Sequence, residues 1–150
     1  MRTKVAESAE RLGLDVRVQR LDSSTRTVAQ AAEAVGCKEA EIAKSIVFVA
    51  DGEPVVCIAS GQHRIDTDKL AEALDVAEVR QAGADEVRAA TGFAIGGVPP
   101  FGHGLTVVFD EELLRHERVW AAAGDPHSLF CADPRELASC TGATVVAVGA

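Results

Sequence analysis

Residues 45–60 have the sequence SIVFVADGEPVVCIAS. It contains two runs rich in β-branched and apolar residues, 45–50 and 54–60, separated only by Asp51-Gly52-Glu53. Two such runs joined by a short loop with Asp-Gly predict a β-hairpin. Because both runs are apolar almost without interruption, we expect strands that are covered on both faces. The hairpin therefore predicts two neighbouring strands of a buried sheet.

Capping residues mark the helices that flank this hairpin. Thr27 with Gln30 resembles a capping box and predicts a helix that ends at Gly36. Asp66 is expected to cap a second helix, and Asp133-Pro134 begins a third. Periodicity and turn residues predict further short helices over 5–12, 84–90 and 110–116.

The remaining segments read as strands between turns. Besides the hairpin, we expect strands over 14–18, 76–80, 105–109, 119–123, 128–132 and 144–148. The elements together predict a single α/β domain (α+β type) over residues 1–150, with a mixed, curved β-sheet of about seven strands and short interspersed helices. Because no glycine-rich phosphate motif follows a strand, a Rossmann or P-loop nucleotide-binding domain is not expected.

The composition is typical of a globular protein, with 47% hydrophobic and 25% charged residues. No apolar run approaches the roughly 20 residues that span a bilayer. The N-terminus lacks the apolar core of a secretion signal, so we expect a cytoplasmic protein without membrane contact. The net charge of −8 argues against DNA and against broad nucleic-acid binding. This net charge is still compatible with a small basic patch that binds one end of an RNA.

The four cysteines give no metal motif. Cys37, Cys57, Cys131 and Cys140 are too widely spaced for the usual zinc or redox patterns. Cys57 and Cys131 lie in apolar runs, where a thiol acts as a small hydrophobe. We expect reduced cysteines and no metal or other cofactor.

Residues 92–104 form an unusual loop, GFAIGGVPPFGHG, with five glycines and two prolines. Glycine allows close approach to the backbone, whereas proline fixes φ and restricts the residue before it. The loop is therefore expected to be shaped, with backbone N–H groups that can face a ligand. The alternative is an ordinary surface crossover.

Several motifs in order along the chain resemble those of the YbaK family, also called the prolyl-tRNA synthetase-associated or editing domain. The resemblance covers roughly residues 25 to 148. It rests on Lys44 ahead of a strand, Asp66 and Lys69, Thr91-Gly92, Gly96-Gly97-Val98-Pro99-Pro100, Phe130, Asp133-Pro134, Leu137 and Thr141-Gly142.

The resemblance implies a free-standing, metal-independent aminoacyl-tRNA deacylase with a mixed α/β fold. Such a protein hydrolyses the ester of a mischarged tRNA, here expected to be tRNA-Pro carrying a small wrong amino acid. It acts as a second sieve after a synthetase whose own pocket cannot reject that amino acid. The implied partners are the 3′ aminoacyl end of tRNA and prolyl-tRNA synthetase. The sequence does not name the amino acid removed.

The resemblance also implies a catalytic set: Lys44, Gly96, Gly97 and Val98. Ester hydrolysis needs donors for the developing oxyanion, and the N–H of Gly97 or Val98 is a candidate, whereas proline has none. Lys44 corresponds to the family's lysine and is expected to hold the phosphate or ribose of the terminal nucleotide. A solvated charge at a strand edge is the alternative for this lysine.

Further residues are candidates for binding the substrate, each with a structural alternative. Phe101 either stacks on adenine or anchors the loop as a hydrophobic pin. His103 either bonds substrate or water or braces the loop, and Asp125 either attracts the substrate's ammonium or only shapes its turn. His63 offers positive charge for RNA or lies in a solvated loop. The remaining candidates are Ser60, Gly61, Pro100 and Gly124.

Two other functions remain open at this point. A noncatalytic domain that binds aminoacyl-tRNA or a synthetase fits the acidic surface and the lack of an obvious general base. A hydrolase for a small ester or thioester would act without tRNA.

Overall fold

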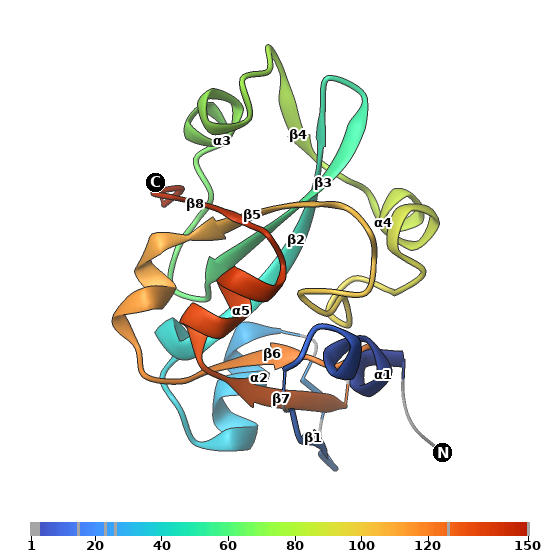
Figure 1. The fold of residues 1–150 in the computed structure, drawn as a ribbon, viewed down its shortest axis with the longest axis vertical. Coiled ribbons are helices and arrows are strands. Elements are labelled where there is room, and N and C mark those ends of the chain that lie inside the picture. The colour runs from blue at the N-terminus through green and yellow to red at the C-terminus, as the bar shows by residue number, and fades with distance from the viewer. Residues whose placement is uncertain (1–3, 15, 23, 26, 126, 150) are drawn as a thin grey trace.

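The computed structural model describes residues 4–14, 16–22, 24–25, 27–125 and 127–149. Eight strands form one mixed β-sheet in the order β1-β7-β6-β2-β3-β5-β8, with β4 added on β2 (Figure 1). This confirms the predicted fold with one strand more than the count of about seven. The strands are β1 (Val18–Arg20), β2 (Ile42–Ala50), β3 (Glu53–Ser60), β4 (Val79–Gln81), β5 (Thr106–Asp110), β6 (Val119–Ala122), β7 (Ser128–Ala132) and β8 (Thr144–Val146).

β2 and β3 form the expected hairpin, which lies in the middle of the sheet, with a turn tighter than the sequence suggested. Glu53 already belongs to β3 and pairs with Ala50. Asp51 and Gly52 both have positive φ, 46° and 85°, as a two-residue type I′ turn requires. The Asp-Gly pair therefore fixes the register of the longest strand pair in the sheet.

The edge of β2 opposite β3 is shared by two shorter strands. β6 pairs in parallel with residues 42–43, and β4 pairs antiparallel with residues 48–50. Among the strands that the structure describes, none pairs with residues 44–47 on this edge. The middle of β2 is therefore an unpaired sheet edge between two paired ends.

Helices connect the strands much as the capping residues indicated. Thr27 Oγ1 accepts from Gln30 N–H at 3.2 Å, and Gln30 Oε1 accepts from Thr27 N–H at 3.3 Å, so the capping box is confirmed. Asp66 and Asp133 cap their helices as expected. The short helix expected over 110–116 is a 3₁₀ helix, and η1 was not predicted. The helices are α1 (Lys4–Arg11), α2 (Val28–Val35), α3 (Thr67–Leu74), α4 (Ala84–Thr91), α5 (Pro134–Cys140), and the 3₁₀ helices η1 (Glu39–Glu41) and η2 (Glu111–Arg115).

Buried side chains cover both faces of the hairpin, as its continuous apolar sequence predicts. On one face Val47 and Ile58 belong to a cluster that extends to the glycine loop and β7. On the other face Phe48 and Cys57 pack in a cluster that includes Leu70 of α3. No helix in the described part of the chain is long and apolar enough to cross a membrane.

Candidate functional site

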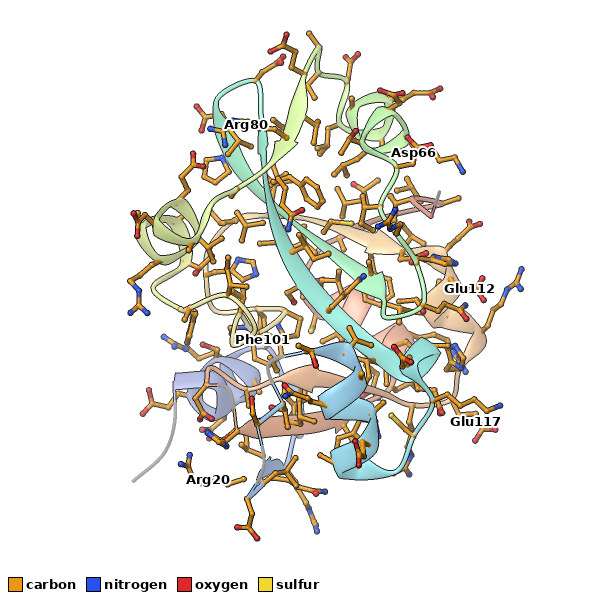
Figure 2. The ribbon with its side chains drawn as sticks, turned by 180° about the vertical axis from the view of Figure 1, so that it is seen from behind. Arg20, Asp66, Arg80, Phe101, Glu112 and Glu117 are labelled. Atoms are coloured by element: carbon orange, nitrogen blue, oxygen red, sulfur yellow. The ribbon has the colours of Figure 1, made fainter. Side chains whose placement is uncertain are left out.

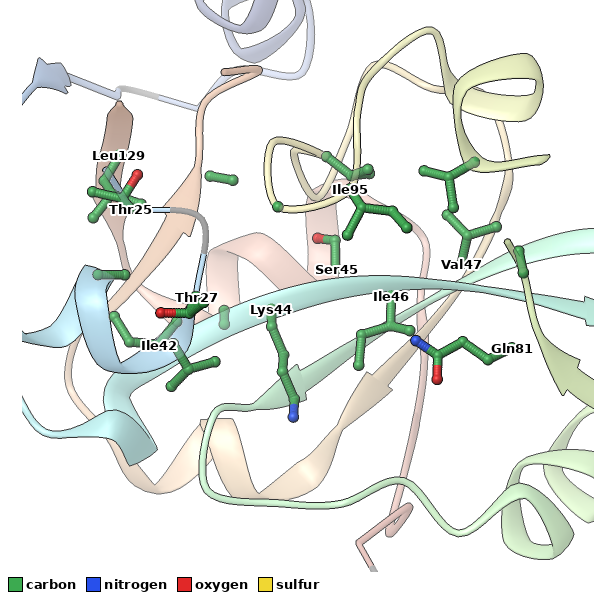
Figure 3. A pocket seen from close by; sticks show the side chains of 18 residues that line it. Thr25, Thr27, Ile42, Lys44, Ser45, Ile46, Val47, Gln81, Ile95 and Leu129 are labelled. Carbon is green, nitrogen blue, oxygen red and sulfur yellow. The ribbon is translucent and has the colours of Figure 1, made fainter. Parts of the chain in front are cut away.

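A pocket of about 180 Å³ lies beside the unpaired segment of β2. Its walls come from β2, the start of α2, α4 and the turn at residues 95–98 (Figure 3). Lys44, Gly96 and Val98 all line it, so two segments that the sequence singled out separately meet here. Most of the other lining residues are apolar, and the polar ones are Thr25, Thr27, Ser45 and Gln81.

The glycine loop enters the pocket as a tight turn over residues 94–97. Gly97 N–H donates to the Ala94 carbonyl at 2.9 Å, and Gly96 has a φ of 86°. A positive φ at the third position of such a turn favours glycine. Within the described part of the chain, the N–H groups of Gly96 and Val98 have no acceptor. The structure therefore moves the candidate donors from Gly97 or Val98 to Gly96 and Val98.

Gly97 serves instead as a packing point for the turn at Gly124 and Asp125. A Cβ on Gly97 would lie 3.3 Å from the backbone of both residues, so a side chain there would push the two loops apart. Asp125 is occupied within its own turn, where it accepts from His127 N–H and Ser128 Oγ–H, both at 2.8 Å. Neither Gly124 nor Asp125 lines the pocket; both support the loop that does.

Phe101 and Pro100 anchor the glycine loop in the core. Phe101 is 3% exposed, and its ring packs against that of Phe130 with centroids 5.5 Å apart. Figure 2 shows Phe101 in the middle of the molecule, whereas the labelled charged side chains lie near its outside. A ring buried in this way has no free face for adenine. In the structure, Phe101 therefore anchors the glycine loop and is not placed to stack on adenine.

His103 closes the loop with both ring nitrogens. Leu105 N–H donates to Nδ1 at 3.1 Å, so Nδ1 is the acceptor of a neutral ring and Nε2–H donates to the Pro100 carbonyl at 3.2 Å. Burial lowers the pKa of His103 below its ordinary value of 6.5, and the bond to Pro100 only partly offsets this. His103 is a brace of the loop and lies outside the pocket lining.

The brace predicts that the protein loses stability in mild acid. A lowered histidine pKa means that the folded state binds fewer protons than the unfolded state below 6.5, so the free energy of unfolding falls as pH falls through this range. Chemical denaturation of wild type and His103→Gln at about pH 7.5 and about pH 5 measures the effect. Wild type is expected to lose more stability than the variant between the two pH values. An equal loss in both proteins would contradict the brace.

Ser60 and Gly61 also lie outside the pocket and hold neighbouring segments together. Ser60 is fully buried, and its Oγ–H donates to the Ala40 carbonyl at 2.9 Å. Gly61 packs so closely on the Glu39 carbonyl and on Val28 that a Cβ would clash with both. Ser60 and Gly61 were predicted to help line the site. They instead hold together segments next to it.

Lys44 and Ser45 leave β2 in opposite directions, as neighbours in a strand do (Figure 3). Lys44 Nζ donates to the His63 carbonyl at 2.8 Å, in the loop that follows β3. Ser45 Oγ is buried and has no partner among the described residues. On the unpaired edge Ala82 N–H donates to the Val47 carbonyl at 3.0 Å. Because peptide groups two residues apart point the same way, Ser45 presents its N–H and C=O to the pocket side.

The groups that set the pKa of Lys44 lie on its own face of the hairpin, which also carries Phe48 and Cys57. Burial lowers the pKa of the Lys44 ammonium below 10.5, and Asp110 partly offsets this. Burial also raises the pKa of Cys57 to about 12, so this thiol is neutral at physiological pH. Asp110 is 0% exposed, and neither it nor Ser45 was identified from the sequence. In the sequence both look like ordinary strand residues. Only the contacts of Asp110 with Ser60 and His63, and the unpaired edge at Ser45, distinguish them.

Comparison with known proteins gives a consistent result. Residues 22–140 match the family model described as the aminoacyl-tRNA editing domain. A crystal structure of a protein proposed to be a trans-editing enzyme for prolyl-tRNA synthetase has 43% identity and a TM-score of 0.91, covering 98% of this chain and 95% of that one. The hypothetical protein APE2540 has 33% identity and a TM-score of 0.92, covering 98% and 99% of the two chains.

Sequence relatives include both a small protein and a synthetase. The uncharacterized protein YwhH of Bacillus subtilis (strain 168) is 37% identical over 123 residues, which is 80% of this chain and 78% of that protein. A proline–tRNA ligase of Maridesulfovibrio salexigens is 29% identical over 104 residues, 67% of this chain. The match spans only 18% of that ligase, so this chain corresponds to a small part of it.

Proposed function

The chain belongs to the aminoacyl-tRNA editing domain family, and from this premise we propose that it is a deacylase that acts in trans on mischarged tRNA. It hydrolyses the ester between a wrong amino acid and the 3′-terminal adenosine, and its substrate is tRNA-Pro carrying a small amino acid. Support for prolyl-tRNA synthetase as a partner comes from the 43% identical structure, which is proposed to be a trans-editing enzyme for that synthetase.

One observation carries this proposal: Lys44 and the turn with Gly96 and Val98 line the same small pocket. The ammonium supplies a positive charge for the ribose and phosphate of the terminal nucleotide. The two backbone N–H groups supply donors for the ester oxygen, whose negative charge grows as water attacks the carbonyl. The pocket thus combines a holder for the RNA end with a place for the reacting ester.

The hydrolysis requires few ionisable groups from the protein. Water attacks the ester carbonyl and loses one proton, and Gly96 and Val98 hold the oxyanion. Collapse of the intermediate breaks the bond to the ribose oxygen, which takes up the proton that the water lost. The described pocket lining has no carboxylate or imidazole. We therefore assign the positioning of the water to the neighbouring ribose hydroxyl of the tRNA.

The size of the pocket supports a small amino acid. A volume of about 180 Å³ corresponds to roughly six water molecules at about 30 Å³ each. An aminoacyl group with about as many non-hydrogen atoms fits this space, whereas drug-sized ligands occupy roughly 300–1,000 Å³. The buried Ser45 hydroxyl favours a ligand with a polar group near it, because an unpaired buried hydroxyl costs about 1–3 kcal/mol.

A panel of mischarged tRNAs tests the proposal. We expect tRNA-Pro carrying a small amino acid to lose its ester well above the buffer rate, with slower cleavage as the side chain grows. A chelator should leave the rate unchanged, and free amino-acid esters should be poor substrates. If the protein cleaves no aminoacyl-tRNA in the panel, the deacylase proposal fails.

The described pocket lining contains no general base, and this favours one alternative, a noncatalytic domain that binds aminoacyl-tRNA or a synthetase. The same panel separates the two functions. Saturable binding of aminoacyl-tRNA without any turnover would support the binding domain.

A further inference from the structure

A chain of hydrogen bonds links a buried carboxylate to the pocket lysine. Asp110, at the end of β5, is 0% exposed, and its Oδ2 lies 2.8 Å from His63 Nδ1. The carbonyl of the same histidine accepts the bond from Lys44 Nζ at 2.8 Å. Figure 3 shows Lys44 extending away from Ile95 toward the loop that follows β3. One residue, His63, thus joins Asp110 to Lys44.

Asp110 is held firmly enough to serve as the fixed end of this chain. Its Oδ2 also accepts from Ser60 N–H, and its Oδ1 accepts from Glu112 N–H, both at 3.0 Å. A buried carboxylate needs such partners to offset its lost hydration. Because an ionised carboxylate can only accept, His63 Nδ1 carries the proton that joins them.

The arrangement exceeds what a helix cap needs. As the cap of η2, Asp110 uses only Oδ1, through Glu112 N–H. The other oxygen is turned toward Ser60 and His63. This second oxygen ties β5 to the loop that follows β3.

The imidazole of His63 is also confined from the other side. A Cβ on Gly149 would lie 2.7 Å from His63 Nδ1, so the backbone near the end of the chain packs directly on the ring. Gly149 is held there by its bridge to Ile65, and Asp66 N–H donates to the Val148 carbonyl at 2.8 Å. The His63 carbonyl therefore has a fixed place relative to the sheet.

We propose that Asp110 and His63 are positioning residues for Lys44. They hold the His63 carbonyl where it takes one N–H of the ammonium and leaves the other two for a ligand that reaches this face of β2. A free lysine samples many rotamers, whereas this tether selects one before the tRNA end arrives. The role of the ammonium in deacylation rests on the proposed function; the tether itself does not.

Side-chain NMR tests the tether without any substrate. Lys69 reports on the surroundings of the ring, because its Nζ donates to the carbonyl of Gly149 at 2.8 Å and Gly149 packs on His63. In wild type, ¹H–¹⁵N spectra should show slowly exchanging ammonium signals for Lys44 and Lys69. In His63→Ala the Lys44 signal should broaden and the Lys69 signal remain. His63→Asn, whose amide nitrogen can replace Nδ1, should restore Lys44.

Either of two NMR results would overturn the proposal. An unchanged Lys44 signal in His63→Ala would show that the ring does not hold the lysine. Loss of both lysine signals would show that the substitution only unravels the loop.

Single-turnover deacylation then tests the positioning role. His63→Ala is expected to slow cleavage by roughly 10- to 100-fold, the usual cost of a misplaced catalytic group, and His63→Asn should recover most of it. In a Lys44→Met background, His63→Ala should cause no further loss, because the two residues act as one unit. An equal loss in both backgrounds would overturn the proposal. If wild type has no deacylase activity, the proposed function fails, and the NMR result still decides the tether.

Discussion

Replacing Lys44 by methionine is expected to lower kcat/KM for deacylation by roughly 10²-fold while the protein stays folded. Methionine keeps a flexible apolar stem of similar length but has no ammonium for the RNA end or for the His63 carbonyl. The side chain is only partly buried, so its exchange should cost little stability. Single-turnover rates on a mischarged tRNA, together with thermal unfolding, measure both effects.

Lys69→Met is the matched control for this experiment. Lys69 makes the same kind of bond, Nζ to a backbone carbonyl at 2.8 Å, but it does not line the pocket. Its loss removes the same charge from the molecule and should leave deacylation unchanged. Unaltered kinetics in Lys44→Met, or equal slowing in both variants, would remove Lys44 from the site.

Phe101→Ala is expected to have the largest effect on stability. Removing a buried phenylalanine ring costs about 3–5 kcal/mol of unfolding free energy, which lowers Tm on the order of 10 °C in a domain of this size. Because the ring holds the glycine loop against Phe130, activity should also fall at temperatures where the variant is fully folded. Thermal unfolding, hydrogen exchange of residues 92–104 and deacylation rates measure the three effects.

Phe48→Ala separates loop anchoring from a general loss of core packing. Phe48 is also 3% exposed but lies in the cluster on the other face of the sheet. It should destabilise the protein similarly while leaving hydrogen exchange of the loop and cleavage at low temperature near wild type. If Phe48→Ala slows deacylation as much as Phe101→Ala, anchoring of residues 92–104 by Phe101 has no specific role in activity.

The parts of the fold that depend on neighbouring residues could be predicted from the sequence. The Asp51-Gly52 turn sets a hairpin, and Thr27 with Gln30 sets a helix start, because each acts over a few positions. A short helix was predicted over 110–116, but its 3₁₀ type was not, since a cap at Asp110 begins either kind of helix. Its last turn depends on contacts that the local sequence does not contain.

The candidate site was predictable only in outline. Lys44 and the glycine loop were expected from the family resemblance, and the structure places them around one pocket. The sequence could not show that Gly97 N–H is consumed inside a turn, or that Asp125 is occupied by its own loop. Ser45 was missed because its importance comes from the gap in strand pairing, which involves segments far away in the chain.

That gap has a consequence for how the protein behaves among other proteins. Unpaired strand edges invite other chains to add a strand, which leads to aggregation. Here β6 and β4 close both ends, and Ala82 N–H donates to the Val47 carbonyl, so only residues 44–46 stay open. This stretch is too short for a foreign strand of the usual five or six residues. A narrow ligand can reach these peptide groups, whereas another sheet cannot. The unpaired segment of β2 can thus form backbone hydrogen bonds with a small ligand without causing aggregation by strand pairing.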